Sequence, residues 1–498
     1  MHPRSWLLPL AFGLVAWLAQ TQVGAQSPAT SAAPTPSSQP APQSAKSPAH
    51  RAESKPPGIK AKTRKSQASA APVGGSASAG SPAPASARPA PAAHPAPTGR
   101  ARPARFGFAD VQRLARQRAA APYVNRSPRL PDSLATLSYN QYRYIRFRAD
   151  HALWRGQGLF EVQFFHRGFA YRRRVNITDI ALDGTLHPLS YSAADFDYSG
   201  SGLQPQGLPA NLGFAGFRVR YPLQQPDRKD ELIVFLGASD FRVLGRNQDF
   251  GAWARGLAID VASADGEEYP YFTDFWLVQP QPQQRTLEIY ALLDSPSLTG
   301  AYRFEIRPSG ATDVEVTATL YPRHSVTKLG IAPLNSMYFY GENSPRAVDD
   351  YRPEVHDSDG LEEQAGDGEW LWRPLSNPKT LTVSSFQDDN PRGFGLVQRD
   401  RDFDHYQDEA AQYQRRPSYW VAPLGNWGQG RVELVEIPSS EEIHDNIIAY
   451  WVPATPLTPG QPFNFSYLLT AYLTSPLWPP GGRAIATRTA RVDGHPGD

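Results

Sequence analysis

Hydrophobic and polar residues alternate along much of the chain after about residue 159. The alternation is clear in Phe160–Phe164, Asp313–Leu320, Arg431–Ile437 and Asn464–Leu473, and Glu231–Leu236 contains a short apolar run. A period of two places alternate side chains on opposite faces of a strand, and a short apolar run suits a strand that is buried on both faces. Gly and Pro separate these segments, as is typical of turns. The pattern predicts an all-β body, a sandwich or a barrel, rather than alternating strands and helices.

One segment has helical spacing instead. From Phe108 to about Ala120, the apolar residues Val111, Leu114 and Ala115 recur on one face. Asp110 lies near the start, where a negative charge interacts favourably with the helix dipole. We therefore predict a single helix just before the β-rich part.

The first residues have the pattern of a secretory signal. Arg4 is followed by the mostly apolar stretch Leu7–Ala19, and Val23 and Ala25 supply the small residues that a signal peptidase requires. The alternative is a membrane anchor, which needs about 20 apolar residues and is less favoured because this run is shorter. We predict a signal peptide at 1–25 and export through the general secretory route.

Residues 26–105 are rich in Ala, Pro and Ser and contain no aliphatic run. Such a segment cannot bury enough apolar surface to form a core, so we predict a disordered tether. Residues 1–105 carry 12 of the 50 Lys and Arg but one of the 48 Asp and Glu, so the remaining body is acidic overall. An acidic body argues against nucleic acid as a partner. The basic tether is interpreted as a solubilising spacer, with contact to anionic lipid or wall polymers as the alternative. We place one domain at 106–480 and a tail at 481–498.

Several chemistries are excluded by what the sequence lacks. It contains no cysteine, which rules out disulfides, thiolate catalysis and cysteine-ligated metals. It also lacks the GxSxG, P-loop and HExxH motifs. Asp357–Gly360 resembles the start of a calcium loop, but the further ligands are missing. We predict no metal site and no cofactor.

Residues 351–451 combine aromatic side chains with many carboxylates and arginines. Rings beside polar groups suit sugars, whose C–H faces stack on aromatic surfaces, although alternate residues such as Trp370 and Trp372 can also simply pack on one sheet face. Cleavage of a glycosidic bond needs one protonated and one ionised carboxyl group. Composition alone cannot select the two. A dense run of carboxylates in and just before this stretch supplies the candidates, which are Asp349, Asp350, Glu354, Asp357, Asp359, Glu362, Glu363, Asp400, Asp402, Asp404, Asp408, Glu441, Glu442 and Asp445.

From Phe106 to about Leu473 the chain resembles the periplasmic glucan biosynthesis family, the G- and D-type proteins of osmoregulated periplasmic glucans. The blocks that carry the resemblance are APYV (121–124), NQYRYIRF (140–147), FFHRGF (164–169), FLGASDFR (235–242), ARGLAID (254–260), ALLDSPSLTGAYRF (291–304), KLGIAPLNSM (328–337), RPEVHDSDGL (352–361), GEWLWRPL (368–375), NPRGFGLVQRDRDFDHYQD (390–408), GRVELVEIP (430–438) and HDNIIAYW (444–451).

The resemblance implies a large β-sandwich of the galactose-mutarotase-like type and action on the β-1,2-glucan backbone in the periplasm. D-type members resemble inverting endo-β-1,2-glucanases, and the matching residues here are Asp445 as general acid and Asp357 as general base. The expected substrate contacts are His356, Glu369, Trp370, Trp372, Arg373, Arg399, Asp404 and Tyr406. The family's smaller immunoglobulin-like domain is expected to be absent, and SSEEIH before Asp445 departs from the usual family pattern.

Two functions follow as hypotheses. The first is an endo-acting glucanase or a related transferring enzyme. The second is a non-catalytic factor that binds the glucan and works with an inner-membrane glucan synthase. A third, an aldose epimerase, rests on fold alone and is the weakest, because fold does not determine function.

Overall fold

The computed structural model describes residues 105–344, 349–475 and 479–489. The predicted signal peptide and nearly all of the predicted tether lie outside these residues. Within the described ranges, no helix has the length and apolar character needed to cross a membrane.

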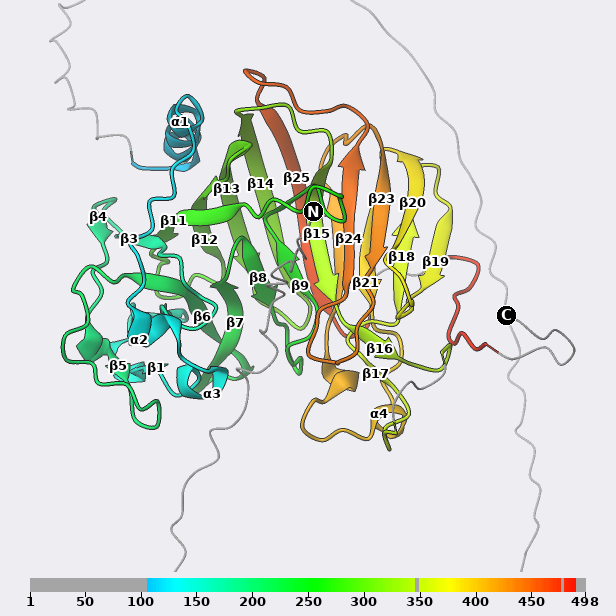
Figure 1. Cartoon of the computed structure of the whole chain (residues 1–498), viewed down its shortest axis with the longest axis horizontal. Coiled ribbons are helices and arrows are strands. Elements are labelled where there is room, and N and C mark those ends of the chain that lie inside the picture. Colours follow the sequence, from blue (N-terminus) through cyan, green and yellow to red (C-terminus); the bar gives the residue numbers. More distant parts are fainter. Residues whose placement is uncertain (1–104, 345–348, 476–478, 490–498) are drawn as a thin grey trace, which may run out of the picture. The chain divides into compact units, whose positions relative to one another are not determined.

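Two large sheets, antiparallel apart from one pair of strands, make up most of the described chain (Figure 1). The strands of the first sheet, in spatial order, are β2 (Glu161–His166), β6 (Phe214–Gln225), β7 (Arg228–Leu236), β8 (Asp240–Val243), β9 (Trp253–Arg255), β15 (Leu329–Ser336), β24 (Ile447–Pro453), β23 (Gln429–Glu436) and β20 (Thr382–Asp389), with β10 (Leu257–Ile259) also paired to β15.

The second sheet is antiparallel except where β3 runs parallel to β11. Its strands, in spatial order, are β19 (Trp370–Pro374), β18 (Gly360–Gln364), β21 (Gly393–Val397), β22 (Ser418–Pro423), β25 (Phe463–Tyr472), β14 (Thr312–Pro322), β13 (Leu298–Arg307), β12 (Leu287–Asp294), β11 (Tyr271–Val278), β3 (Asn176–Ile180) and β4 (Leu186–Pro188).

The remaining elements are short apart from the first helix. The two small strand pairs are β1 (Arg146–Phe147) with β5 (Phe196–Asp197) and β16 (Tyr338–Tyr340) with β17 (Val355–His356). The helices are α1 (Phe108–Ala119), α2 (Asp132–Ala135), α3 (Tyr139–Tyr142) and α4 (Phe403–Tyr406), and the 3-10 turns are η1 (Ala149–His151), η2 (Ala193–Asp195) and η3 (Tyr413–Arg415).

The main hydrophobic core lies between the two large sheets. Phe217 on β6 packs edge-on against Phe275 on β11, with ring centroids 4.9 Å apart. Phe235 on β7 contacts Phe304 on β13 in the same way at 5.1 Å. Burial of such rings contributes roughly 1.5–3 kcal/mol each. Side chains from both sheets therefore share one core, and the predicted β-sandwich is confirmed.

The segments with strand spacing became strands, and the segment with helical spacing became a helix. The predicted strands correspond to β2, β7, β14, β23 and β25. Helix α1 ends one residue before the predicted boundary and buries Val111 and Ala115. These residues pack against the second sheet, where Thr299 Oγ1 on β13 donates to the carbonyl of Ala115 at 2.8 Å.

The short pair β16–β17 and helix α4 lie close together at one end of the sandwich (Figure 1). Three chain segments that are distant in sequence lead to this end. They are the end of β15, the residues before β24, and the loop that contains α4 and η3. This end of the sandwich carries the predicted catalytic residues.

Candidate active site

Strand register brings Asp445 next to Trp253. Asn335 on β15 pairs with Trp253 on β9 and with Ile448 on β24, so the start of β9 and the start of β24 flank the same point of β15. Asp445 lies just before β24. Trp253 Nε1 donates a hydrogen bond to Asp445 Oδ2 at 2.8 Å. The sheet therefore fixes this carboxyl group through a neighbouring strand.

Asp357 follows β17 directly and is nearly buried, with 4% of its surface exposed. Its backbone N–H donates to the Met337 carbonyl at 2.8 Å, and its carboxylate is paired with the guanidinium of Arg416. Arg416 lies 4.0 Å above the ring of Tyr413. A Cβ on Gly251 would stand 2.7 Å from the Cβ of Arg416, so only glycine leaves room for this arginine. Packing thus holds a cation against the predicted base.

The environment of Asp445 favours its protonated form. Desolvation raises the pKa of Asp445 to about 6. The nearby Arg242 opposes this rise, the negative charge of Asp357 adds to it, and the Trp253 hydrogen bond also opposes it. Since Asp357 contributes to the pKa of Asp445, the two carboxylates lie within electrostatic reach of each other. The structure therefore brings the two predicted catalytic residues into one site.

Residues that the sequence did not single out complete this site. Arg242 lies 5.8 Å from the ring of Trp253, and Arg255 lies 5.4 Å from the same ring. Desolvation raises the pKa of Asp240 to about 7, against the charges of Arg255 and Arg242. Asp240, Arg242 and Arg255 occur in the blocks FLGASDFR and ARGLAID, which carried the family resemblance. The charged residues in these blocks were the available sequence signal for a site. That signal does not reveal which carboxylate the three side chains approach.

His356 and Tyr406 are both buried and pack against each other, and His356 directly precedes Asp357 in the chain. His356 Nδ1 donates to Gln398 Oε1 at 2.9 Å, and its Nε2 donates to Glu354 Oε2 at 2.7 Å. Burial alone would lower the pKa of His356, but the hydrogen bond and charge of Glu354 raise it above the usual value. Tyr406 packs edge-on against the His356 ring at 5.3 Å and donates to the Asp400 carbonyl. Direct contact between Tyr406 and a substrate would require α4 to move.

Trp372 and Arg399 form a second cluster with Asp359. The guanidinium of Arg399 lies 3.2 Å from the centroid of the Trp372 ring, and its Nε is 3.4 Å from Asp359 Oδ1. The ring also covers Gly360, where an added Cβ would lie 2.0 Å from the Cζ2 atom of Trp372. Arg399 also donates to the carbonyl of Ala484. The segment 479–489 therefore contacts the side chain that stacks on Trp372.

The other predicted substrate residues form no hydrogen bond or ion pair with Asp357 or Asp445 within the described ranges. Trp370 is on the same strand face as Trp372 and stacks on Trp420, with ring centroids 5.7 Å apart. Arg373 points to the opposite face, 3.5 Å from the buried Glu436. Glu369 is exposed, and Asp404 lines a surface hollow on the α4 loop.

Among the predicted site residues, Asp357 and Asp445 therefore lie within electrostatic reach of each other. His356 packs against Tyr406, and Arg399 stacks on Trp372. Trp370 is placed with Trp420 instead, and Glu369, Arg373 and Asp404 have no contact with the carboxylate pair among the hydrogen bonds and ion pairs of the described residues. The substrate-contact roles of all eight residues stay predictions.

A family model described as "Periplasmic glucan biosynthesis protein, MdoG" matches residues 106–497. The chain belongs to this family. It is 54% identical over 365 residues to "Glucans biosynthesis protein G" of Ralstonia nicotianae, a match that covers 73% of this chain and 72% of the relative. It is 48% identical over 398 residues to "Glucans biosynthesis protein D 1" of the same organism, covering 77% and 74%. The predicted family is thus confirmed, together with a role in periplasmic glucan biosynthesis.

Among solved structures, a galactose mutarotase related enzyme from Lactobacillus acidophilus is similar at 8% sequence identity. The match covers 52% of this chain and 91% of that protein, with a TM-score of 0.23. The β-sandwich rests on the strand pairing and the shared core.

Proposed function

We propose that this family member cleaves the β-1,2-glucan backbone in the periplasm as an inverting endo-β-1,2-glucanase, or transfers it in a related reaction. Asp445 is the general acid and Asp357 the general base. The observation that carries the proposal is the placement of Asp445 beside Trp253, at the end of the sandwich that also holds Asp357. Desolvation there raises the pKa of Asp445 to about 6. A general acid must keep its proton near the working pH, and an unperturbed aspartic acid with a pKa of about 4 would not.

The roles of the two residues follow from their surroundings. Asp445 is desolvated and lies in the field of Asp357, which favours its neutral form. The carboxylate of Asp357 is instead held in an ion pair with the guanidinium of Arg416. In glycoside hydrolysis, one carboxyl group protonates the leaving oxygen while the other activates water. Different environments for two nearby carboxyl groups are the usual sign of such a division of roles.

A binding function without turnover is the second candidate, and one observation favours it. Asp357 is 4% exposed and its carboxylate is engaged by Arg416, so Arg416 must yield before Asp357 can accept a proton from water. A protein that only guides the glucan towards an inner-membrane synthase would not need to free Asp357 from Arg416. The two candidates differ in whether the glucan is shortened.

Product analysis separates them. The purified full chain is incubated with linear β-1,2-glucan, and oligosaccharides are followed by chromatography. Shortened products are expected from the native chain and from Asp227→Asn, a matched control in the exposed turn between β6 and β7. Asp445→Asn and Asp357→Asn should each reduce the rate at least about 100-fold. Cleavage that survives in both variants contradicts the assignment of the pair. Tight glucan binding without any cleavage supports the second candidate.

A further inference from the structure

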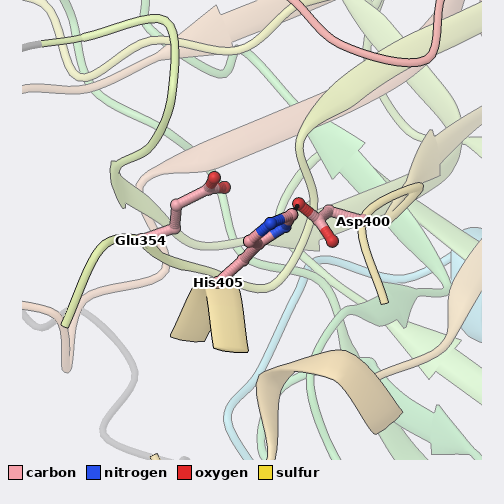
Figure 2. A group of neighbouring side chains, drawn as sticks. All are labelled: Glu354, Asp400 and His405. Atoms are coloured by element: carbon pink, nitrogen blue, oxygen red, sulfur yellow. Dashed lines mark hydrogen bonds and ion pairs between the residues drawn. The ribbon is translucent and has the colours of Figure 1, made fainter. Parts of the chain in front are cut away.

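A second group of polar side chains is linked to His356, the chain neighbour of Asp357, by the hydrogen bond between His356 and Glu354. Glu354 comes just before β17, Asp400 follows β21, and His405 lies in α4. One carboxylate oxygen of each acid and one ring nitrogen of His405 lie within 4.8 Å of one another. Figure 2 shows the ring of His405 between the two carboxylates. His405 Nδ1 and Asp400 Oδ2 are 2.6 Å apart.

The side chain of Glu354 is about nine-tenths buried, with 9% exposed, and its Oε2 accepts the hydrogen bond from His356 Nε2. Figure 2 shows this carboxylate at the edge of the group that contains His405. Burial of a carboxylate is unfavourable unless cations or hydrogen bonds compensate its charge.

No basic side chain other than histidine neutralises the group. In the described ranges, neither Glu354 nor Asp400 forms an ion pair with a lysine or an arginine. The two arginines that flank Asp400 are held elsewhere. Arg399 pairs with Asp359, and Arg401 donates to the carbonyls of Leu473, Gln414 and Arg416.

We propose that Glu354, Asp400 and His405 form a binding site for a divalent transition-metal ion, best matched to Zn²⁺. Two carboxylate oxygens and one imidazole nitrogen are ligands that zinc accepts, at about 2.0–2.2 Å each. The present spread of up to 4.8 Å closes to such a geometry through side-chain rotation of His405, which is half exposed. Water completes the coordination shell from the solvent side. Mg²⁺ and Ca²⁺ prefer sites made of oxygen alone and fit this ligand set less well.

The ion would connect two segments that shape the catalytic pair. Glu354 ligates through one oxygen and keeps its hydrogen bond to His356 through the other, and His356 is followed directly by Asp357. Asp400 and His405 belong to the loop that continues to Arg416, the partner of Asp357. Bound metal therefore fixes the α4 loop against β17. Such partners behind a ligand orient it and typically change metal affinity about 10–100-fold when removed.

The test measures metal binding directly and does not depend on glucan cleavage. The purified full chain is dialysed against chelator, and Zn²⁺, Mn²⁺ and Mg²⁺ are titrated by calorimetry. The variants are His405→Ala and Asp400→Asn, which lie on a partly exposed loop. The matched controls are His324→Ala, an exposed histidine with no side-chain partner in the described residues, and Asp402→Asn, the same charge change in the same loop.

One Zn²⁺ per chain is expected, with Mn²⁺ weaker and Mg²⁺ weakest. His405→Ala and Asp400→Asn should each weaken Zn²⁺ binding about 100-fold or more, while both controls remain within about threefold of the native chain. Saturating Zn²⁺ should also raise the Tm of the native chain, and not of His405→Ala, because it binds only the folded state. The proposal is overturned if the native chain binds no stoichiometric Zn²⁺. It is equally overturned if the controls lose binding as much as the ligand variants do. Either result leaves the proposed glucanase activity untouched.

Discussion

Replacement of Trp253 by phenylalanine is predicted to raise the pKa of Asp445 and to extend activity to higher pH. Trp253 Nε1 donates to Asp445 Oδ2 at 2.8 Å, and this bond stabilises the ionised carboxylate. Phenylalanine removes the N–H group but keeps an aromatic ring near Arg242 and Arg255, which lie 5.8 and 5.4 Å from the present ring. The substitution therefore changes one hydrogen bond and little of the packing.

The size of the shift follows from the strength of that bond. A hydrogen bond to a charged group contributes about 1.5–3 kcal/mol. One pKa unit corresponds to about 1.4 kcal/mol, so the full loss would raise the pKa by about one to two units. Water that enters the space replaces part of the interaction, and we expect a rise of about one unit, from about 6 to about 7. A general acid is active only while protonated, so activity falls as the pH rises through its pKa. The alkaline limb should move to higher pH by the same amount.

The assay is the pH dependence of kcat/KM for linear β-1,2-glucan between about pH 4 and pH 9, with the full chain. Carbon-13 NMR titration of the aspartate carboxyl groups reports the same pKa without relying on turnover. Trp427→Phe is the matched control, because Trp427 Nε1 donates to the Ser466 carbonyl at 3.1 Å, away from the site. The control should leave the alkaline limb in place.

The reasoning is refuted if Trp253→Phe leaves the pKa of Asp445 unchanged or lowers it. An unchanged value would mean that the indole N–H makes no net difference between the two protonation states. A lowered value would mean that loss of the indole admits enough water to reverse the desolvation that dominates the pKa of Asp445.

Three further substitutions test the energetics of the same end of the sandwich. Asp445→Asn should stabilise the protein by about 1–3 kcal/mol at about pH 8 and much less at about pH 4.5, because the raised pKa means that stability is lost as Asp445 ionises near pH 6. Arg416→Ala should lower the free energy of unfolding by about 3–5 kcal/mol, since Asp357 is left buried without its partner. Gly360→Ala should cost about 1–3 kcal/mol and displace Trp372, whose ring lies 2.0 Å from the added Cβ. Urea unfolding measures all three, and tryptophan fluorescence reports the displacement.

Each of these three predictions would be contradicted by a specific result. Equal effects of Asp445→Asn at both pH values would contradict the desolvation of its carboxyl group. A loss below about 0.5 kcal/mol for Arg416→Ala would mean that Asp357 is reached by water. A neutral Gly360→Ala would mean that the Trp372 ring is free to move away.

Secondary structure was largely predictable because it depends on local pattern. The period-two segments became β2, β14, β23 and β25, and the apolar run became β7. The helix ended one residue from its predicted boundary, because the spacing of its apolar residues and its acidic first turn both indicate the same helix. The order of the strands within each sheet was not predictable, because β15 is hydrogen-bonded to β9 and β24, which are distant in sequence.

The proposed catalytic pair could be named only through the family blocks, because the fourteen carboxylates of the dense run had equivalent local signals. Its chemistry depends on partners that periodicity does not reveal. Trp253 and Arg416 reach Asp445 and Asp357 from 192 and 59 residues away along the chain. The resemblance implied a substrate contact for Tyr406 but gave no information about its burial, and tertiary packing places its ring against His356.

By itself the sequence determined a β-rich body, one helix before it, and a family with its two aspartates, because these depend on short-range periodicity and on contiguous blocks. Only the tertiary structure decided which charges surround those aspartates. Strand register places Trp253 beside Asp445, and a glycine at position 251 admits Arg416 against Asp357. A carboxyl group's pKa is set by desolvation and by charges close in space. Those distances are properties of the packed sandwich, and no local pattern contains them.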